Sequence, residues 1–145
     1  MKENYPVNIV EEIWTYLSPF SAHQIKILDR VFPTVEHAYQ WAKFSDEKIQ
    51  DEILNAVSAK QAWTIAQKYK KDFLNPEFNK NKIMEELFRA KLEQHADVKE
   101  VLVLTGTRGI LKIHPEDFYW GTGSDGTGEN KMGKLWQKLR EEIIK

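Results

Sequence analysis

The sequence predicts a single domain over residues 1–145 that is mainly α with a small antiparallel β element (α+β). Three observations support this fold class. Helix-capping residues followed by apolar residues three or four positions apart recur from Thr34 onward. Two short stretches, 23–28 and 110–113, have the β-branched, alternating composition of strands. A length of 145 residues suits one domain with one core.

Composition and charge exclude several classes of protein. The chain has no cysteine, which rules out disulfides, thiolate metal sites and cysteine nucleophiles. Its four histidines show no metal-ligand spacing, which leaves only a metal site assembled from residues distant in sequence; we expect neither a metal nor a cofactor. With 21 Lys and Arg against 22 Asp and Glu, the chain lacks the basic excess of non-specific nucleic-acid binders. Because no apolar signal-peptide or membrane-spanning run occurs, we expect a soluble, cytoplasmic protein that does not bind membranes.

The first 32 residues predict a turn and a short strand. Leu17 to Ala22 is turn-like, and we expect Phe20, beside Pro19, to lie in the core or in the wall of a pocket. Residues 23–28 alternate polar and apolar side chains, which predicts a strand that ends near Asp29.

The stretch Pro33–Phe44 predicts the helix around which the chain is organised. Thr34 is a good N-cap, and a carboxylate follows in the first turn, where the helix dipole favours negative charge. At 3.6 residues per turn, Glu36, Tyr39, Gln40 and Lys43 share one face. Glu36 and Lys43 are about 10 Å apart along the axis, a spacing that suits a ligand between them. The alternative is an ordinary amphipathic helix with a solvated polar face.

Three helices are predicted after this stretch, and we interpret them mainly as scaffold. The first is capped at 45–47, the second begins at Ser58, and the third spans about 80–95. Met84 and Phe88 are expected in the core. The lysine-rich segment 68–82 is either a solvated face or a surface that steers an anionic substrate. The apolar positions expected to face inward are Ile49, Ile53, Leu54, Val57, Ala59, Ala62, Trp63, Ala66 and Tyr69.

The next segment is ambiguous between helix and strand. Asp97 can cap a short helix through 101–104 that stops at Gly106, although the apolar run also fits a strand. Residues 110–113 read as a strand, and pairing them with 23–28 would form a small sheet against the helices.

A glycine-rich loop precedes the last predicted helix. Five of the seven glycines lie between residues 121 and 133, directly after the string Asp117-Phe-Tyr-Trp120. Asn130 can cap the helix that carries Met132, Leu135, Trp136 and Leu139. Such a loop before a helix N-terminus can hold phosphate, or it can be a plain glycine turn. We reject a dinucleotide-binding site, because no β-α-β unit fits here.

Two motifs together resemble the NADAR family, the YbiA-like N-glycosidases. One is Pro-Thr-Val-Glu-His followed by Gln and Lys-Phe within 33–44. The other is Asp117-x-Tyr119-Trp120-Gly121-x-Gly123-x-x-Gly126-x-Gly128-x-Asn130-x-x-Gly133-Lys134, and Leu104-Thr105-Gly106 lies between them. The resemblance covers the chain from about Leu17 to Arg140. It departs from the family pattern at Ile113, which replaces an acidic residue, and at Ala66-Gln67, where a Gly-Arg pair is missing.

The resemblance implies a YbiA-like helical fold and hydrolysis of a bond between a ribose carbon and a nitrogen. The expected substrates are phosphorylated ribosyl small molecules, such as riboflavin biosynthesis intermediates and ADP-ribose compounds, and ADP-ribosylated nucleic acid. The alternative is a non-catalytic ADP-ribose or nucleotide-binding module.

The family's site residues are carried over to this chain as expectations. In this hypothesis Lys43 attacks the anomeric carbon and forms a Schiff base, while Glu36 shuttles protons. Burial must lower the pKa of Lys43, although Glu36 opposes this. Asp117 either bonds ribose hydroxyls or caps its turn. The expected catalytic residues are Glu36, Lys43 and Asp117, and the expected substrate-binding residues are Phe20, Tyr39, Gln40, Tyr119, Trp120, Gly121 and Asn130.

Overall fold

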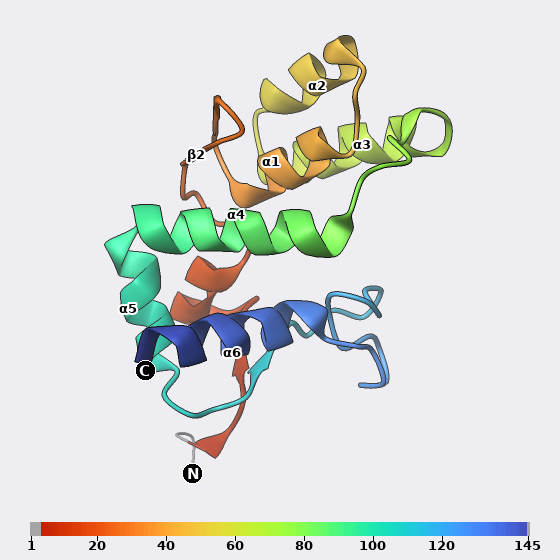
Figure 1. Cartoon of the computed structure of the whole chain (residues 1–145). Helices are drawn as coiled ribbons and strands as arrows, with labels where there is room; N and C mark the ends of the chain where they lie inside the picture. The colour runs from red at the N-terminus through yellow and green to blue at the C-terminus, as the bar shows by residue number, and fades with distance from the viewer. Residues whose placement is uncertain (1–3, 145) are drawn as a thin grey trace. The chain divides into compact units, whose positions relative to one another are not determined.

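The computed structural model describes residues 4–144 and divides the chain into two compact units (Figure 1). Pro19–His95 form what we call the middle unit, and Met1–Ser18 with Ala96–Lys145 form the terminal unit. The prediction of one domain over 1–145 stays a prediction. The predicted fold class is confirmed, because the described residues are mostly helical with little sheet. None of their helices has the length and apolar character needed to cross a membrane.

The middle unit contains a hairpin and four helices. The strands β2 (Ile25–Ile27) and β3 (Arg30–Phe32) pair antiparallel, with Ile27 opposite Arg30. Leu28 and Asp29 connect them with positive φ angles of 54° and 58°, as a two-residue hairpin turn of type I′ requires. The helices are α1 (Val35–Ala42), α2 (Glu47–Leu54), α3 (Ala59–Phe73) and α4 (Lys80–Gln94).

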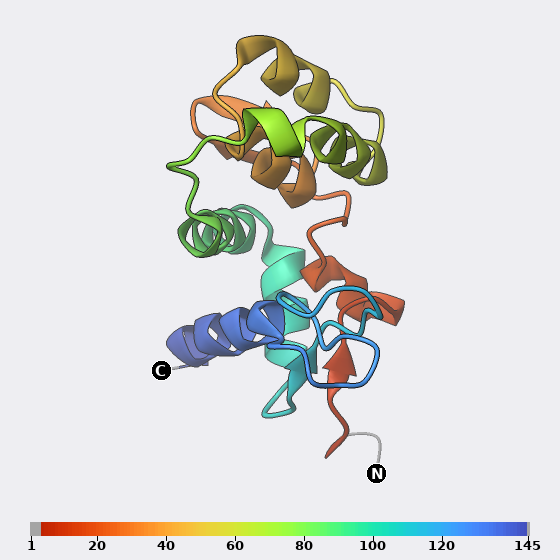
Figure 2. The same cartoon turned by 90° about the vertical axis from the view of Figure 1, so that its right-hand side faces the viewer.

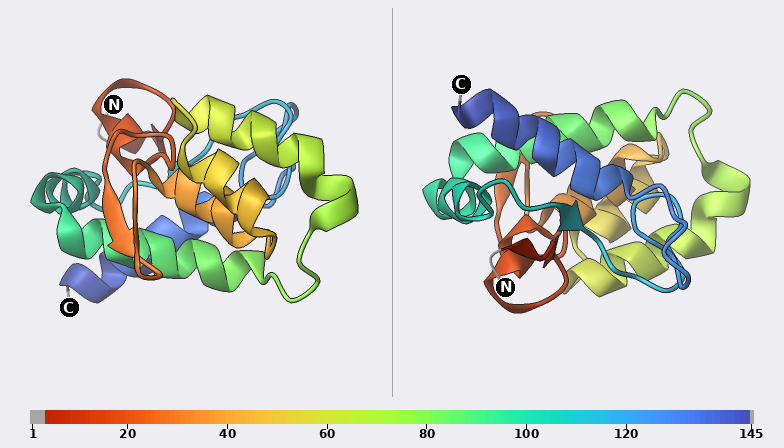
Figure 3. Two further views of the ribbon diagram at one scale, coloured as in Figure 1. Left: turned by 90° about the horizontal axis from the view of Figure 1, so that it is seen from above. Right: turned by 90° about the horizontal axis from the view of Figure 1, so that it is seen from below.

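Helix α1 packs against α2, α3 and α4, and it lies beside α4 in Figures 1 and 3. The Thr34 hydroxyl accepts from the His37 amide at 3.0 Å, which confirms the predicted N-cap. The His37 ring is buried between this hydroxyl, 2.8 Å from Nδ1, and the carbonyl of Ala56, 3.0 Å from Nε2. Since a carbonyl only accepts, Nε2 carries the proton and a neutral ring has Nδ1 as acceptor.

The core of the middle unit was predicted with two errors. A buried cluster joins Phe44, Ile49, Ile53 and three alanines, and the predicted core residues Met84 and Phe88 are also buried. Val57, however, is 89% exposed and Trp63 is 40% exposed. Val57 comes after α2 has ended at Leu54, so the helical spacing used to place it no longer applies. Trp63 lies on the outer face of α3, where Lys60 sits 4.9 Å from its ring.

The described part of the terminal unit contains a small parallel ladder, one 3-10 helix and two α-helices (Figure 2). Its elements are β1 (Val7–Asn8), the 3-10 helix η2 (Glu12–Leu17), α5 (Ala96–Leu104), β4 (Ile110–Leu111) and α6 (Lys131–Ile144). The helix reading of 101–104 is confirmed, and Gly106 ends α5 with a φ of 61° while its amide donates to Val103. Asp97 lies inside the first turn of α5 rather than before it, and its carboxylate accepts from the Val98 amide.

The predicted pairing of strands was wrong. Residues 110–111 pair in parallel with Val7–Asn8, whereas 25–27 pair with 30–32. Each predicted strand therefore has its partner inside its own unit. The register of the hairpin is set locally by its tight turn, which leaves Ile25 opposite Phe32 with both side chains buried.

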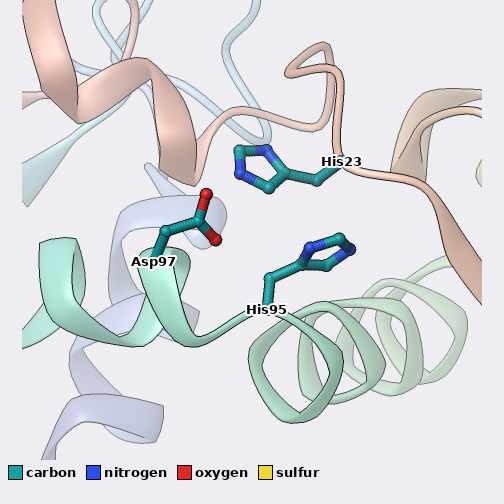
Figure 4. Close-up of side chains that lie close together, drawn as sticks. All are labelled: His23, His95 and Asp97. Carbon is teal, nitrogen blue, oxygen red and sulfur yellow. The ribbon is translucent and has the colours of Figure 1, made fainter.

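Two histidines of the middle unit contact each other at the end of α4 (Figure 4). The rings of His23 and His95 meet edge to face, 4.9 Å between centroids. His23 Nδ1 shares a hydrogen bond of 2.8 Å with Ser21, and His95 Nε2 is bonded to the carbonyl of Gln24. These bonds hold each ring through one nitrogen and fix its orientation.

Candidate functional site

The polar face of α1 is buried, which excludes the interpretation of α1 as an amphipathic helix with a solvated face. Glu36 is 6% exposed, Tyr39 6%, Gln40 2% and Lys43 8%. Burying a carboxylate, an amide and an amine within about two turns of helix is unfavourable unless each finds a partner. The residues around α1 must therefore supply partners for these buried polar groups.

Partners within the helix order this face. The Gln40 amide donates to Glu36 Oε2 at 2.6 Å, one turn apart. The Lys43 ammonium lies 5.0 Å from the centroid of the Tyr39 ring, and this ring is in turn edge to face with Phe78 at 5.5 Å. The Glu36 amide donates to the carbonyl of Pro19 at 3.0 Å, which satisfies a first-turn donor of α1.

Lys43 is fixed at the end of α1 by the loop that joins α3 to α4. The helix ends at Ala42, two residues before the predicted end. The carbonyl of Lys43 accepts from the Asn75 amide at 2.8 Å, and Phe44 forms a bridge with Leu74. This anchoring brings the last turn of α3 and the first turn of α4, both carrying lysines, to the same end of α1.

The pKa of Lys43 is lowered to about 8. Burial is the largest cause, and the positive charges of Lys70 and Lys80 add to it. Glu36 acts in the opposite direction, as the sequence predicted. The role of Lys70 and Lys80 was not predicted. Their position in a lysine-rich segment was the only signal available for them.

Phe20 belongs to the turn just before the hairpin of the middle unit. Its side chain is 45% exposed, so the expectation that it lies in the core is wrong. Its neighbour Pro19 is bonded to the first turn of α1 through the carbonyl that Glu36 contacts. The alternative expectation, a wall of a pocket, stays a prediction.

The motif of the terminal unit is organised around the Asp117 carboxylate. One oxygen accepts from the amides of Tyr119 at 3.2 Å and Trp120 at 2.9 Å, and the other accepts from Lys112 Nζ at 2.6 Å. Burial raises the pKa of this carboxyl, but Lys112 and the two amides outweigh it, and the net pKa is lowered. Asp117 therefore caps its turn, which is the second of the two roles expected for it.

The amides of the glycine loop are engaged within the loop itself. Those of Gly123, Gly128, Glu129 and Asn130 donate to loop carbonyls at 2.7–3.0 Å. The first amides of α6, of Lys131 and Met132, donate to the carbonyls of Tyr119 and Trp120. These donors are thus not available to a phosphate, and the predicted phosphate cradle is wrong for them. Gly123, with a φ of 72°, instead lets the Phe118 ring pack directly on the backbone.

Asn130 joins the loop to strand β4 rather than capping α6 with its side chain. Its Oδ1 accepts from the Lys112 amide at 3.0 Å, and its Nδ2 donates to the carbonyl of Ile110 at 2.9 Å. Its backbone has a φ of 50°, a conformation that asparagine tolerates better than most residues. Gly121 is buried in the same loop, and its missing Cβ leaves room for the carbonyls of Lys112 and Asp117.

The predicted site residues fall into the two units. Glu36, Tyr39, Gln40 and Lys43 lie together on α1 in the middle unit. Asp117, Tyr119, Trp120, Gly121 and Asn130 lie in the terminal unit, where the Tyr119 and Trp120 rings meet edge to face at 5.0 Å. That the two sets share one cleft stays a prediction.

Comparison with known proteins identifies the family. The NADAR domain matches residues 8–144. N-glycosidase YbiA of Escherichia coli strain K12 is 36% identical over 127 residues, which are 87% of this chain and 79% of that protein. The riboflavin biosynthesis protein VVA0006 of Vibrio vulnificus is 29% identical over 129 residues, 88% of this chain but 35% of that protein.

A solved structure supports the same relationship. The NMR structure of E. coli YbiA matches with a TM-score of 0.84 and 32% identity, covering 97% of this chain and 86% of that one. The names of the relatives agree with the predicted enzyme class, a hydrolase that acts on N-glycosyl bonds. The match of sequence, motifs and fold shows that this chain belongs to the NADAR domain family.

Proposed function

We propose that this protein hydrolyses the bond between the anomeric carbon of a ribose and a nitrogen, in a phosphoribosyl or ADP-ribosyl compound. The observation that carries the proposal is a buried lysine, Lys43, with a pKa lowered to about 8 on the same helix face as a buried glutamate, Glu36. An amine of this kind can act as a nucleophile near neutral pH.

The lowered pKa changes how much reactive amine is present. With a pKa of about 8, roughly 10% of Lys43 is neutral at pH 7. With the ordinary value of 10.5, about 0.03% would be neutral. The environment of α1 therefore supplies about 300 times more nucleophile at pH 7.

In the proposed reaction, neutral Lys43 Nζ forms a bond to the anomeric carbon. The bond between that carbon and the leaving nitrogen breaks, the electron pair stays on the nitrogen, and Glu36 shuttles the proton that the base takes up. The ribose ring then opens to a protonated imine on Lys43. Addition of water and expulsion of the amine release the sugar and restore Lys43, so that the net reaction consumes one water.

The anionic part of the substrate is the feature that the surrounding lysines favour. Lys70 and Lys80 lie close enough to influence the charge of Lys43, and both side chains are exposed. Two exposed cations beside the nucleophile attract phosphate or diphosphate and raise its local concentration. This supports the anion-steering interpretation of segment 68–82.

We assign the remaining predicted residues as follows. In the middle unit Tyr39 and Phe20 form walls of the pocket; on the prediction that the two sets of residues share one cleft, Trp120 stacks on the leaving base with Tyr119 beside it. Asp117 acts chiefly by positioning Tyr119 and Trp120, because its carboxylate holds both of their amides. Asn130 and Gly121 position the segment of Tyr119 and Trp120 through the backbone, because the Asn130 amide donates to the Gly121 carbonyl.

The test begins with a panel of compounds: NAD, ADP-ribose, a phosphoribosyl-aminopyrimidine and ADP-ribosylated DNA. Free base is detected by mass spectrometry, and borohydride is added during turnover to reduce an imine. We expect free base from at least one compound and a sugar adduct on Lys43. We also expect Lys43→Ala and Glu36→Gln to abolish turnover in folded proteins, while Lys71→Ala retains it.

Other results would contradict parts of this proposal. Loss of turnover in Lys43→Ala with no trapped adduct in the unsubstituted protein would favour catalysis by two carboxylates instead. Binding of a ribosyl compound without release of base would indicate a non-catalytic binding module.

A further inference from the structure

The side-chain amide of Gln40 has a defined orientation inside the buried face of α1. Gln40 is 2% exposed, and one end of its amide lies 2.6 Å from Glu36 Oε2. A carboxylate accepts hydrogen bonds, so the end that faces Glu36 must be the donor Nε2. The other end of the amide, the acceptor Oε1, therefore points away from Glu36.

This acceptor has no donor in the part of the chain that the structure describes. Among residues 4–144, Gln40 Oε1 is the one buried side-chain nitrogen or oxygen without a hydrogen-bond partner. Buried polar atoms are nearly always hydrogen-bonded, and each exception in a native structure requires an explanation, of which a catalytic role is one. The orientation cannot be reversed to remove the problem, because that would place a carbonyl oxygen against Glu36.

The position of Gln40 identifies the group that it can meet. Gln40 lies four residues after Glu36 and three before Lys43, so the Cα atoms of Gln40 and Lys43 are about 4.5 Å apart along the helix axis. If Lys43 bonds to the anomeric carbon, as proposed above, the 2-hydroxyl is on the next carbon of the sugar. It is then the closest hydroxyl that can donate to an acceptor one turn earlier on the helix.

We infer that Gln40 Oε1 accepts a hydrogen bond from the 2-hydroxyl of the substrate's ribose and makes the site selective for ribosyl over 2-deoxyribosyl compounds. This inference rests on the proposed function. Bonds to the 2-hydroxyl of a sugar strengthen as positive charge develops at the anomeric carbon, so the contact favours catalysis as well as recognition. Gln40 also keeps Glu36 oriented through its Nε2.

The experiment measures the affinity of sugar phosphates that differ only at carbon 2. Ribose 5-phosphate, its epimer arabinose 5-phosphate and 2-deoxyribose 5-phosphate are titrated calorimetrically into the full chain carrying Lys43→Met, so that no imine forms. We expect ribose 5-phosphate to bind about tenfold more tightly than the other two, because each of those leaves Oε1 without a donor.

Two further variants in the same background complete the test. In Gln40→Met the new side chain has a similar length but no acceptor, so the three sugar phosphates should bind with about equal affinity. Gln67→Met makes the same change at an exposed position of α3 and should preserve the preference. If circular dichroism shows that Gln40→Met is unfolded, the three sugars on the protein that retains Gln40 decide the question alone.

The outcomes separate the two proposals. Equal affinities for the three sugars, or a preference that survives Gln40→Met, would overturn the role of Gln40 and would mean that water meets Oε1. The proposed hydrolysis would stand in that case. If none of the sugar phosphates binds, the phosphoribosyl substrate itself is contradicted, and the role of Gln40 with it.

Discussion

The lowered pKa of Lys43 gives the most direct test of the proposed chemistry, and replacement of Lys70 by glutamine is the perturbation. Lys70 lies in the last turn of α3 and is exposed, so its loss should not disturb the core. Its positive charge lowers the pKa of Lys43, second only to burial. Lys70→Gln should therefore raise the pKa of Lys43 and reduce the fraction of neutral amine at pH 7.

The magnitude for the unsubstituted protein follows from the pKa of about 8. The neutral fraction is about 1% at pH 6, about 10% at pH 7 and about 50% at pH 8. If neutral Lys43 limits the reaction, kcat/KM rises about tenfold from pH 6 to 7, about fivefold from 7 to 8, and flattens above pH 8. With an ordinary lysine it would continue to rise tenfold per pH unit up to about pH 10.

The pKa can also be measured without a substrate, by NMR titration of the lysine side chains. The Lys43 resonance is assigned by its absence in Lys43→Arg. Lys71→Gln is the matched control, because Lys71 is the next residue on α3 and is not among the charges that affect Lys43. The reasoning is refuted if Lys43 titrates near 10.5, or if Lys70→Gln and Lys71→Gln shift it equally.

Three further predictions concern stability. Lys43→Met should raise the free energy of unfolding by roughly 3 kcal/mol at pH 7, because it removes the penalty of burying an ammonium. This penalty is full below pH 8 and disappears between pH 8 and 10.5, so urea denaturation should show the gain at pH 7 and not at pH 10.5. Asp117→Ala should cost about 2 kcal/mol and Asp117→Asn less, because asparagine keeps an acceptor for the turn; equal losses would contradict the capping role. Gly133→Ala should cost about 3 kcal/mol or more of stability, since its Cβ would collide with the carbonyl of Ile110. Gly106→Ala adds a Cβ in open space and should cost about 1 kcal/mol for its positive φ; thermal unfolding that gives the reverse order would contradict the packing argument.

The helices could be predicted because their signals are local. Thr34, Asp46, Ser58 and Asn79 accept hydrogen bonds from amides two or three residues later, and each is the N-cap of a helix in the structure. Three of these caps were used to place helices from the sequence. Their energetics depend on a few neighbouring residues, so no knowledge of the tertiary structure was needed.

Strand pairing could not be predicted in the same way. The hairpin turn at Leu28–Asp29 uses two positive φ angles without the asparagine or glycine that normally marks it. The partner of 110–111 is a two-residue strand at Val7–Asn8, too short to show any alternation. Because such pairings are decided by contacts distant in sequence, two short apolar stretches were paired with each other instead of with their true partners.

The residues of α1 were identified from the sequence, but the sequence left open whether their face is a buried site or a solvated surface. A carboxylate, a phenol, an amide and an amine on one helix face resemble an ordinary solvated surface until neighbouring elements cover them. The glycine loop shows the opposite error. Its composition suggests free amides for phosphate, whereas the tertiary structure uses several of those amides to close the loop. In both cases the sequence identified the polar groups correctly, but whether these groups face solvent depended on tertiary packing.

The burial of α1 also sets a limit on how the site can bind an anion. Lys70 and Lys80 lower the pKa of Lys43 because they are positive, and an anion that neutralises them would remove this effect. Tyr39, whose ring faces the ammonium, and Glu36 already favour the charged form. Burial is the largest cause of the shift and is independent of the anion. Lys43 can therefore stay reactive with a phosphate bound nearby because the largest cause of the lowered pKa, desolvation, does not depend on the two lysines.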